Sequence, residues 1–204
     1  MDQLNHIIKK MNEYSPKFLG YRHEHAVLLP LVYHNREWHL LFEIRSHNIT
    51  HPGEVSFPGG RVEKHETALR ASLRETYEEI GFPIERINVI GEIDRIANGY
   101  RIVHCFVGIL MDFDEQELVL NKNEVSKVFF KPLHYFLENK PNLFTFENER
   151  RIGSDFPESN FKNIDTTQFK TGVYEHTTPY YPVEEEIIWG LTAQLIQHFV
   201  EVIK

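Results

Sequence analysis

Two short stretches decide how this sequence is interpreted: Gly59–Glu66, with the sequence GGRVEKHE, and Arg74–Phe82, with the sequence RETYEEIGF. Residues 67–80, which follow the first stretch and include most of the second, have a helical pattern. Gly81 lies where a glycine commonly ends a helix. At about 100° per residue, one stripe of this helix is predicted to be buried, namely Leu69, Leu73, Thr76, Tyr77 and Ile80.

Three carboxylates, Glu75, Glu78 and Glu79, lie on a separate face of the same helix at i, i+3 and i+4. One interpretation is a solvated acidic face in which Arg74 pairs with Glu78. The other is a site for a hard divalent cation, since Mg²⁺ prefers carboxylate oxygens. The Gly59-Gly60 pair favours the cation site, because backbone without side chains can approach the ion closely.

The flanking sequence predicts an α/β domain with a mixed sheet, in one domain covering residues 1–204. A short amphipathic helix is expected at Leu4–Met11, within an N-terminal helix and linker of residues 1–20. Strands are predicted at Ala26–Tyr33, Trp38–Arg45, Ile87–Arg95, Ile102–Asp112 and Val125–Phe130, with turns at residues 34–37 and 98–99.

The C-terminal third contains two different segments. Residues 139–184 are rich in Asn, Pro, Gly, Ser and Thr but also in aromatic residues, which predicts irregular structure. Its aromatic side chains either pack back onto the domain or shape a substrate site. Residues 185–203 have apolar positions at helical spacing, so a packed terminal helix is expected there.

Composition excludes several classes of protein. The chain has 204 residues and a formal net charge of −8, which argues against non-specific nucleic-acid binding. Its apolar runs are too short to cross a bilayer, and a single cysteine, Cys105, excludes an intrachain disulfide. We therefore expect a cytoplasmic protein without nucleic-acid or membrane partners.

The decisive stretch resembles the Nudix box, written G-x5-E-x7-R-E-U-x-E-E-x-G-U, where U is apolar. The seven fixed positions are Gly60, Glu66, Arg74, Glu75, Glu78, Glu79 and Gly81, and all of them match. Phe82 fits the last apolar position, whereas Thr76 replaces the first. The resemblance implies an α/β/α sandwich around a mixed sheet and hydrolysis of nucleoside diphosphate derivatives with Mg²⁺ or Mn²⁺.

The resemblance also implies roles for the matching residues. Glu75, Glu78 and Glu79 would bind the metal together with the Gly59 carbonyl. Arg74 would orient these carboxylates, while Gly60 and Glu66 would support the loop. The catalytic base varies in this superfamily, so Glu75, Glu79 and Glu124, which lies on a later loop, all stay open.

Two further stretches are similar to signatures of the coenzyme A diphosphatase branch. Residues 41–60 are similar to L-L-T-x-R-S-x3-R-x3-G-x3-F-P-G-G, with Arg45-Ser46 matching the R-S pair. Leu41-Phe42-Glu43 replaces L-L-T, one residue is missing before Gly53, and the middle arginine is absent. Residues 188–193, IWGLTA, resemble the final helix of the same branch.

These signatures predict a hydrolase that cleaves coenzyme A or acyl-CoA into 4′-phosphopantetheine, or its acyl form, and adenosine 3′,5′-bisphosphate. Arg45 and Ser46 are expected to contact the substrate, since a guanidinium suits a phosphate. The alternative is a hydrolase of ADP-ribose or a dinucleoside polyphosphate, in which Tyr100 would stack on a base. A non-catalytic Nudix sensor is a third interpretation, and a homodimer stays open.

Overall fold

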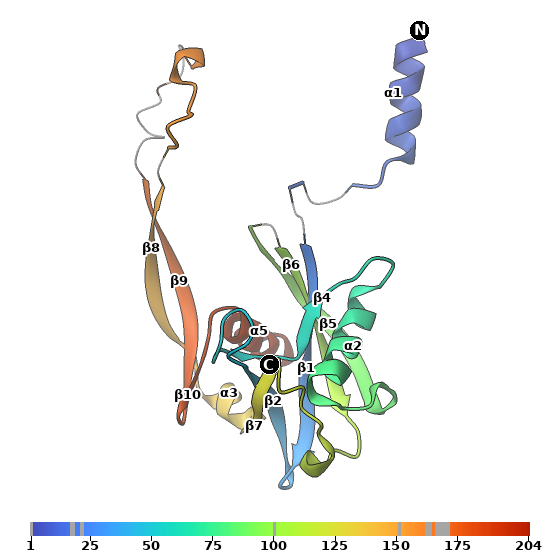
Figure 1. Ribbon diagram of the computed structural model, residues 1–204, viewed down its shortest axis with the longest axis vertical. Helices are drawn as coiled ribbons and strands as arrows, with labels where there is room; N and C mark the ends of the chain where they lie inside the picture. Colours follow the sequence, from blue (N-terminus) through green and yellow to red (C-terminus); the bar gives the residue numbers. More distant parts are fainter. Residues whose placement is uncertain are drawn as a thin grey trace.

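The computed structural model describes residues 2–16, 19–20, 23–99, 101–150, 152–161, 165 and 172–204. In these residues the body of the protein is a seven-stranded sheet with helices on both faces, and a separate three-stranded sheet lies beside it (Figure 1). The larger sheet contains β1 (His23–His34), β2 (Glu37–Arg45), β3 (Val55–Ser56), β4 (Gly59–Arg61), β5 (Ile87–Asn98), β6 (Arg101–Leu110) and β7 (Val125–Pro132). The smaller sheet contains β8 (Asn142–Arg150), β9 (Gly172–Val183) and β10 (Glu186–Trp189).

Four α-helices and three short 3₁₀ turns complete the described elements. The α-helices are α1 (Asp2–Glu13), α2 (Ala68–Ile80), α3 (Leu133–Glu138) and α5 (Gly190–Ile203). The 3₁₀ turns are Ile84–Arg86, Glu115–Glu117 and Glu158–Asn160. None of the described helices is long and apolar enough to span a membrane.

The predicted mixed sheet is confirmed. Its main order is β3-β2-β1-β6-β5, with β4 paired to β1 and β7 paired to β2. β1 and β6 are parallel, whereas β1 and β2 form an antiparallel hairpin. The turn between β1 and β2 has positive φ at both Asn35 (50°) and Arg36 (70°), the conformation that two-residue hairpins favour.

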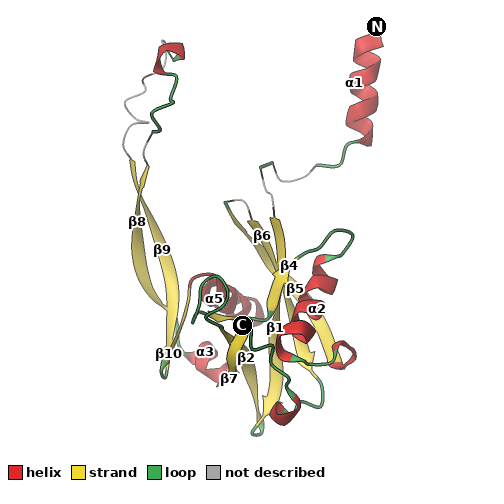
Figure 2. Ribbon diagram, in the orientation of Figure 1, coloured by secondary structure: helices red, strands yellow, loops and turns green. Residues whose placement is uncertain are grey.

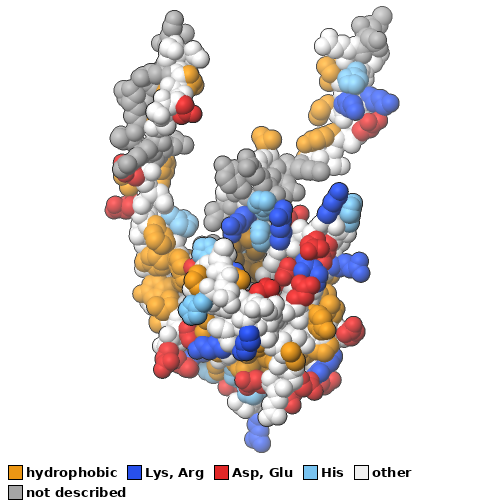
Figure 3. All heavy atoms as spheres, viewed as in Figure 1, with side chains coloured by type: hydrophobic (Ala, Val, Ile, Leu, Met, Phe, Trp, Pro, Cys, Tyr) orange, Lys and Arg blue, Asp and Glu red, His pale blue; other side chains and the backbone are white. Residues whose placement is uncertain are grey.

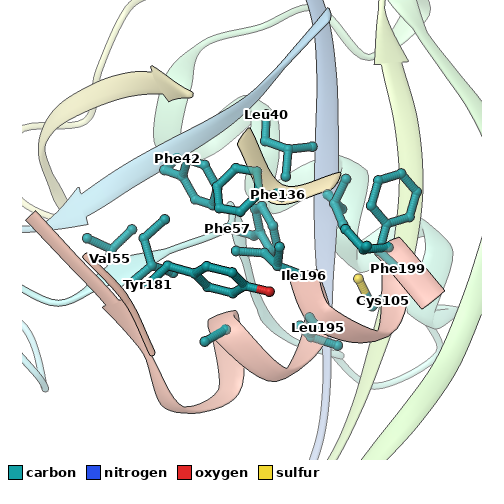
Figure 4. Close-up of a cluster of buried hydrophobic side chains, with 14 of the residues drawn as sticks. Leu40, Phe42, Val55, Phe57, Cys105, Phe136, Tyr181, Leu195, Ile196 and Phe199 are labelled. Atoms are coloured by element: carbon teal, nitrogen blue, oxygen red, sulfur yellow. The ribbon is translucent and has the colours of Figure 1, made fainter. Parts of the chain in front are cut away.

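The sheet separates two hydrophobic cores, because successive strand residues point to opposite faces. Leu40 and Phe42 of β2 belong to the core beneath α5, which also contains Phe136 of α3 and Tyr181 of β9 (Figure 4). Leu41 belongs instead to the core beneath α2. The predicted α/β/α sandwich is therefore confirmed, and α2 is held firmly against one face of the sheet.

The prediction of irregular structure at residues 139–184 is wrong for much of that segment. β8 and β9 form an antiparallel hairpin that projects from the body, with Thr145 opposite Thr177 (Figure 2). Thr, Tyr and Phe favour strands, and pairing with a distant partner gives them that conformation despite the polar composition.

The terminal segment also differs from the prediction. Residues 186–189 form β10, in which Ile188 is opposite Tyr181, and the helix begins only at Gly190. Gly190 has a φ of 62°, and this left-handed conformation turns the chain from the strand into the helix.

Candidate active site

Helix α2 positions the predicted site, and both of its ends are capped. The Thr67 side chain accepts a hydrogen bond from the Arg70 N–H, and Gly81, with a φ of 73°, ends the helix in the left-handed conformation. The buried face differs from the predicted stripe, because Tyr77 is 55% exposed and Leu69 and Leu73 are only partly buried. Thr76 and Ile80 are buried as predicted, and Ala71, Ser72 and Glu79 are buried with them.

Two small polar residues explain how the buried stripe of α2 is rotated. Ser72 and Thr76 are fully buried, and their hydroxyls donate to backbone carbonyls within the helix at 2.8 and 2.7 Å. Because these hydroxyls need no outside partner, the buried face can turn away from Tyr77 and include Glu79.

The three glutamates of α2 have different surroundings. Glu79 is 3% exposed, and its Oε2 accepts a 2.8 Å hydrogen bond from the Gly59 N–H. Glu75 is partly buried, whereas the Glu78 side chain is 51% exposed. The helix therefore presents carboxylates at three depths, from the edge of the sheet outward to solvent.

Arg74 connects this helix to the preceding loop. Its Nε and Nη2 both donate to the Glu66 carboxylate at 3.0 Å, and its Nη1 lies 2.9 Å from Glu75 Oε1 and 2.8 Å from Glu78 Oε2. Nη2 also donates to the Arg61 carbonyl at 3.1 Å. Hydrogen bonding to Arg74 lowers the pKa of Glu66. Acidic and basic side chains accordingly lie side by side over this part of the molecule (Figure 3).

The two glycines before the helix leave room for different neighbours. A Cβ on Gly60 would overlap the Glu75 carboxylate. A Cβ on Gly59 would instead overlap the β1 backbone at Ala26 and Val27, to which β4 is paired. Gly59 therefore allows the strands to approach each other, whereas Gly60 allows the Glu75 carboxylate to approach the loop backbone.

Two further acids approach Glu75 and Glu79. Glu124, on the loop before β7, accepts a 3.1 Å hydrogen bond from the Asn121 side chain. Glu43, on β2, is 1% exposed, and its Oε1 accepts a 2.8 Å bond from the Ser56 hydroxyl. We call Glu43, Glu75, Glu79 and Glu124 the carboxylate cluster.

Burial is the main cause of raised pKa values for Glu43, Glu75 and Glu79, and the charge of Glu124 raises all three further. Glu43 was missed as a site residue from sequence. The available signal was a single acid in an apolar strand, LLFEI.

The residues present fit a divalent cation. Within the described part of the chain, no three His, Cys, Asp or Glu side chains are already arranged to hold one ion. However, Glu43 Oε2 is buried without a hydrogen-bond partner among the described groups, and the absence of a side chain at Gly60 lets the Glu75 carboxylate lie against the loop backbone. Carboxylates that are partly desolvated in this way would be stabilised by a bound cation.

The other predicted contact residues shape the loop at residues 46–58. Arg45 Nε donates to the Thr50 carbonyl at 2.9 Å, and the Ser46 N–H donates to the Glu124 carbonyl at 2.8 Å. The Ser46 hydroxyl donates to the Asn123 carbonyl. Their contact with substrate stays a prediction. Tyr100 lies outside the described residues.

The two stretches with coenzyme A signatures meet in space. The Thr192 hydroxyl donates to the Val55 carbonyl at 3.0 Å. Beside this contact is an open groove of about 580 Å³, lined by Pro52, Gly53, Glu54, Phe144, Tyr180, Ile187 and Trp189. The groove lies outside the carboxylate cluster, but the loop at residues 46–58 borders it and also bonds to Glu124 through Ser46.

Comparison with known proteins identifies the family of this chain. The NUDIX domain family model matches residues 22–149. Nudix hydrolase 3 of Caenorhabditis elegans is 31% identical over 175 residues, which is 84% of this chain and 69% of that protein. The chain therefore belongs to the Nudix family of pyrophosphohydrolases.

Two other matches are informative. The peroxisomal coenzyme A diphosphatase NUDT7 of Mus musculus is 33% identical over 68% of this chain, and the match spans 61% of the mouse protein's length. The crystal structure of a MutT/nudix family protein from Enterococcus faecalis has a TM-score of 0.50 and 14% identity. The structural match covers 98% of this chain and 69% of the Enterococcus faecalis chain. The shared fold therefore extends beyond the residues matched by the family model.

Proposed function

We propose that this chain hydrolyses the pyrophosphate bond of coenzyme A or acyl-CoA, giving 4′-phosphopantetheine, or its acyl form, and adenosine 3′,5′-bisphosphate. The observation that carries the proposal is the contact between Thr192 and Val55, which joins the two coenzyme A signature stretches beside one groove. The similarity to the mouse coenzyme A diphosphatase supports the same substrate class.

Charge explains why the carboxylate cluster suits this chemistry. The chain has a net charge of −8 and would repel an anionic pyrophosphate unless cations offset that charge. When bound, Mg²⁺ or Mn²⁺ would neutralise phosphate charge and make a water more acidic. Glu75, Glu78 and Glu79 with the Gly59 carbonyl are the proposed ligands.

The remaining residues position these groups. Arg74 forms ion pairs with Glu75 and Glu78 and so fixes the position of both carboxylates. Glu66 in turn binds Arg74 to the loop. The carboxylate that takes the proton from the attacking water is Glu75, Glu79 or Glu124. Burial raises the pKa of Glu75 and Glu79, so either carboxylate would accept the proton more readily than an exposed one. Glu124, whose charge acts on both, is the third candidate.

The groove is the proposed place for the pantetheine arm. It is lined mainly by apolar and aromatic side chains, including Tyr180 and Trp189. Such a surface suits an uncharged chain better than a second phosphate. Arg45, at the base of the bordering loop, is the proposed contact for a phosphate of the nucleotide.

A panel of substrates tests the proposal. Coenzyme A, acetyl-CoA, ADP-ribose and a diadenosine polyphosphate are incubated with the chain in Mg²⁺ or Mn²⁺, and products are identified by mass spectrometry. We expect the highest kcat/KM for coenzyme A or acetyl-CoA. A preference for ADP-ribose or the dinucleotide would overturn the substrate assignment, and no turnover of any compound would favour a sensor.

The cellular compartment does not follow from the fold. The cytoplasmic location stays a prediction from the sequence, since the mouse relative is named as peroxisomal.

A further inference from the structure

Glu43 is an acidic residue in a position where its strand is otherwise apolar. Its neighbours Leu40, Leu41 and Phe42 are fully buried, and Glu43 itself is 1% exposed. Carboxylates are almost never fully buried unless they are paired. Glu43 nevertheless has only half of its carboxylate satisfied, because Ser56 donates to Oε1 while Oε2 has no partner among the described groups.

The strand directs Glu43 towards α2. Phe42 and Ile44 point into the core beneath α5, whereas Leu41 points into the core beneath α2. By the alternation of a strand, Glu43 shares the face of Leu41. Glu79 is a buried residue of α2, which packs on the same face of the sheet. After burial, the charge of Glu43 is the largest cause of the raised pKa of Glu79.

Two ionised carboxylates that are buried near each other repel unless a positive charge lies between or beside them. Among the described residues, the side chains of Glu79 and Glu43 accept hydrogen bonds from neutral donors, the Gly59 N–H and the Ser56 hydroxyl. The guanidinium of Arg74 is engaged with Glu66, Glu75 and Glu78. The charge of Arg45 lowers the pKa of Glu43, but burial outweighs it, and the Arg45 Nε donates to the Thr50 carbonyl rather than to Glu43. Glu43 and Glu79 therefore form the part of the carboxylate cluster where a bound cation would relieve the repulsion.

We propose that Glu43 is a further metal-binding residue, whose unpartnered Oε2 would hold the divalent cation together with the carboxylates of α2. Glu43 lies outside the family box, and the branch signature has threonine at this position. The carboxylate is thus a feature of this chain's own site. The inference rests on the proposed metal site, but it does not depend on coenzyme A being the substrate.

Titration with Mn²⁺ alone tests the proposal without turnover. Metal binding is measured by isothermal titration calorimetry and by the loss of the free Mn²⁺ electron-paramagnetic-resonance signal, at one fixed pH. E43Q keeps the size and the Ser56 contact, and E43T introduces the signature residue. We expect both to bind Mn²⁺ about tenfold or more weakly, because loss of a group beside a metal typically costs about 10–100-fold in affinity.

Two controls separate a metal role from a structural one. S56A removes the hydrogen-bond donor to Glu43 but keeps the carboxylate, so its Mn²⁺ affinity should stay within about twofold of the unmodified chain. E115Q removes an exposed acid outside the cluster and should leave Mn²⁺ affinity unchanged. Circular dichroism and the Tm in EDTA verify that each variant is folded, and the Mn²⁺-induced rise in Tm gives a second measure of binding.

The outcomes are distinct. Unchanged Mn²⁺ affinity in both folded Glu43 variants would overturn this inference. If E79Q also bound Mn²⁺ normally, the proposed metal site itself would fail. Loss of binding in E79Q but not in E43Q or E43T would reject Glu43 alone.

Discussion

The Gly59 N–H donates a 2.8 Å hydrogen bond to Glu79 Oε2, and this bond joins the start of β4 to the last turn of α2 across twenty residues of sequence. The donor belongs to a residue predicted to bind metal through its carbonyl. The acceptor belongs to the most deeply buried of the three helix glutamates. One peptide unit and one carboxylate therefore fix where the loop, the helix and the sheet meet.

Alanine at the two glycines should have different effects. Gly59→Ala introduces a Cβ against the β1 backbone, which cannot move away, so we expect lower stability by about 1–3 kcal/mol. Gly60→Ala meets the end of the Glu75 side chain, so the fold should persist while Mn²⁺ affinity falls. Urea unfolding and calorimetric titration of both variants check this, and equal effects of the two on metal binding would contradict it.

Charge removal at the proposed ligands should abolish turnover. Glu78→Gln and Glu79→Gln each remove a ligand, and kcat should fall by more than the roughly 10–100-fold that outer groups cost. Initial rates with coenzyme A and Mg²⁺ measure this, with Glu115→Gln as an exposed control. Full turnover by either variant in a folded state would remove that residue from the site.

Arg74 should not be replaceable by lysine. One ammonium group cannot reach Glu66, Glu75, Glu78 and the Arg61 carbonyl together, as the guanidinium does. We expect Arg74→Lys to reduce metal affinity about 10–100-fold. Arg70→Lys, one turn earlier and exposed, is the matched control. A variant with normal affinity would show that Arg74 is dispensable for orienting the carboxylates.

Stability should decrease below pH 6.5 because of His25. Burial, followed by the charges of Arg101, His23 and Arg61, lowers the pKa of His25 from 6.5 in the native state. The unfolded chain then binds more protons, so this contribution to stability is complete above 6.5 and is lost as pH falls through the lowered native pKa.

His25→Gln should remove this part of the pH dependence. The free energy of unfolding of both chains is measured in urea between about pH 5 and 8, and their difference isolates His25. Parallel curves for the two chains would reject the contribution.

A charge in the apolar groove should affect long substrates most. Ile187 lines the groove and is 58% exposed, so Ile187→Glu should fold normally yet raise KM for acyl-CoA by about tenfold. Ile90→Glu, on β5 and 56% exposed, is the control. Kinetics with acyl-CoA and ADP-ribose check it, and an equal rise for both substrates would argue against the groove as the binding place of the arm.

Local pattern was sufficient to predict α2 and its surroundings. Gly81 ended the helix as expected, and the hairpin around residues 34–37 was correctly placed. These features depend on residues close in sequence. The mixed sheet and its two covering layers also followed, because the resemblance carried the overall fold.

The missed features depend on contacts between distant residues. Glu43 approaches Glu79 only because β2 lies in the sheet that α2 covers, and no local periodicity contains that information. The β8–β9 hairpin has polar and proline-containing strands, so its pairing of Thr145 with Thr177 was hidden by composition. Tyr77 was misplaced because Ser72, whose hydroxyl donates to a carbonyl within the helix, was not expected to be buried.

Cys105 has a consequence for experiments on this chain. It is the only cysteine, it is fully buried beneath α5 (Figure 4), and burial raises its thiol pKa to about 12. A thiol reagent can therefore react only when the sheet and α5 separate, and its rate reports that opening without an added label. A second cysteine placed on the β8–β9 hairpin would then carry a fluorophore with little background, and could follow the hairpin during catalysis.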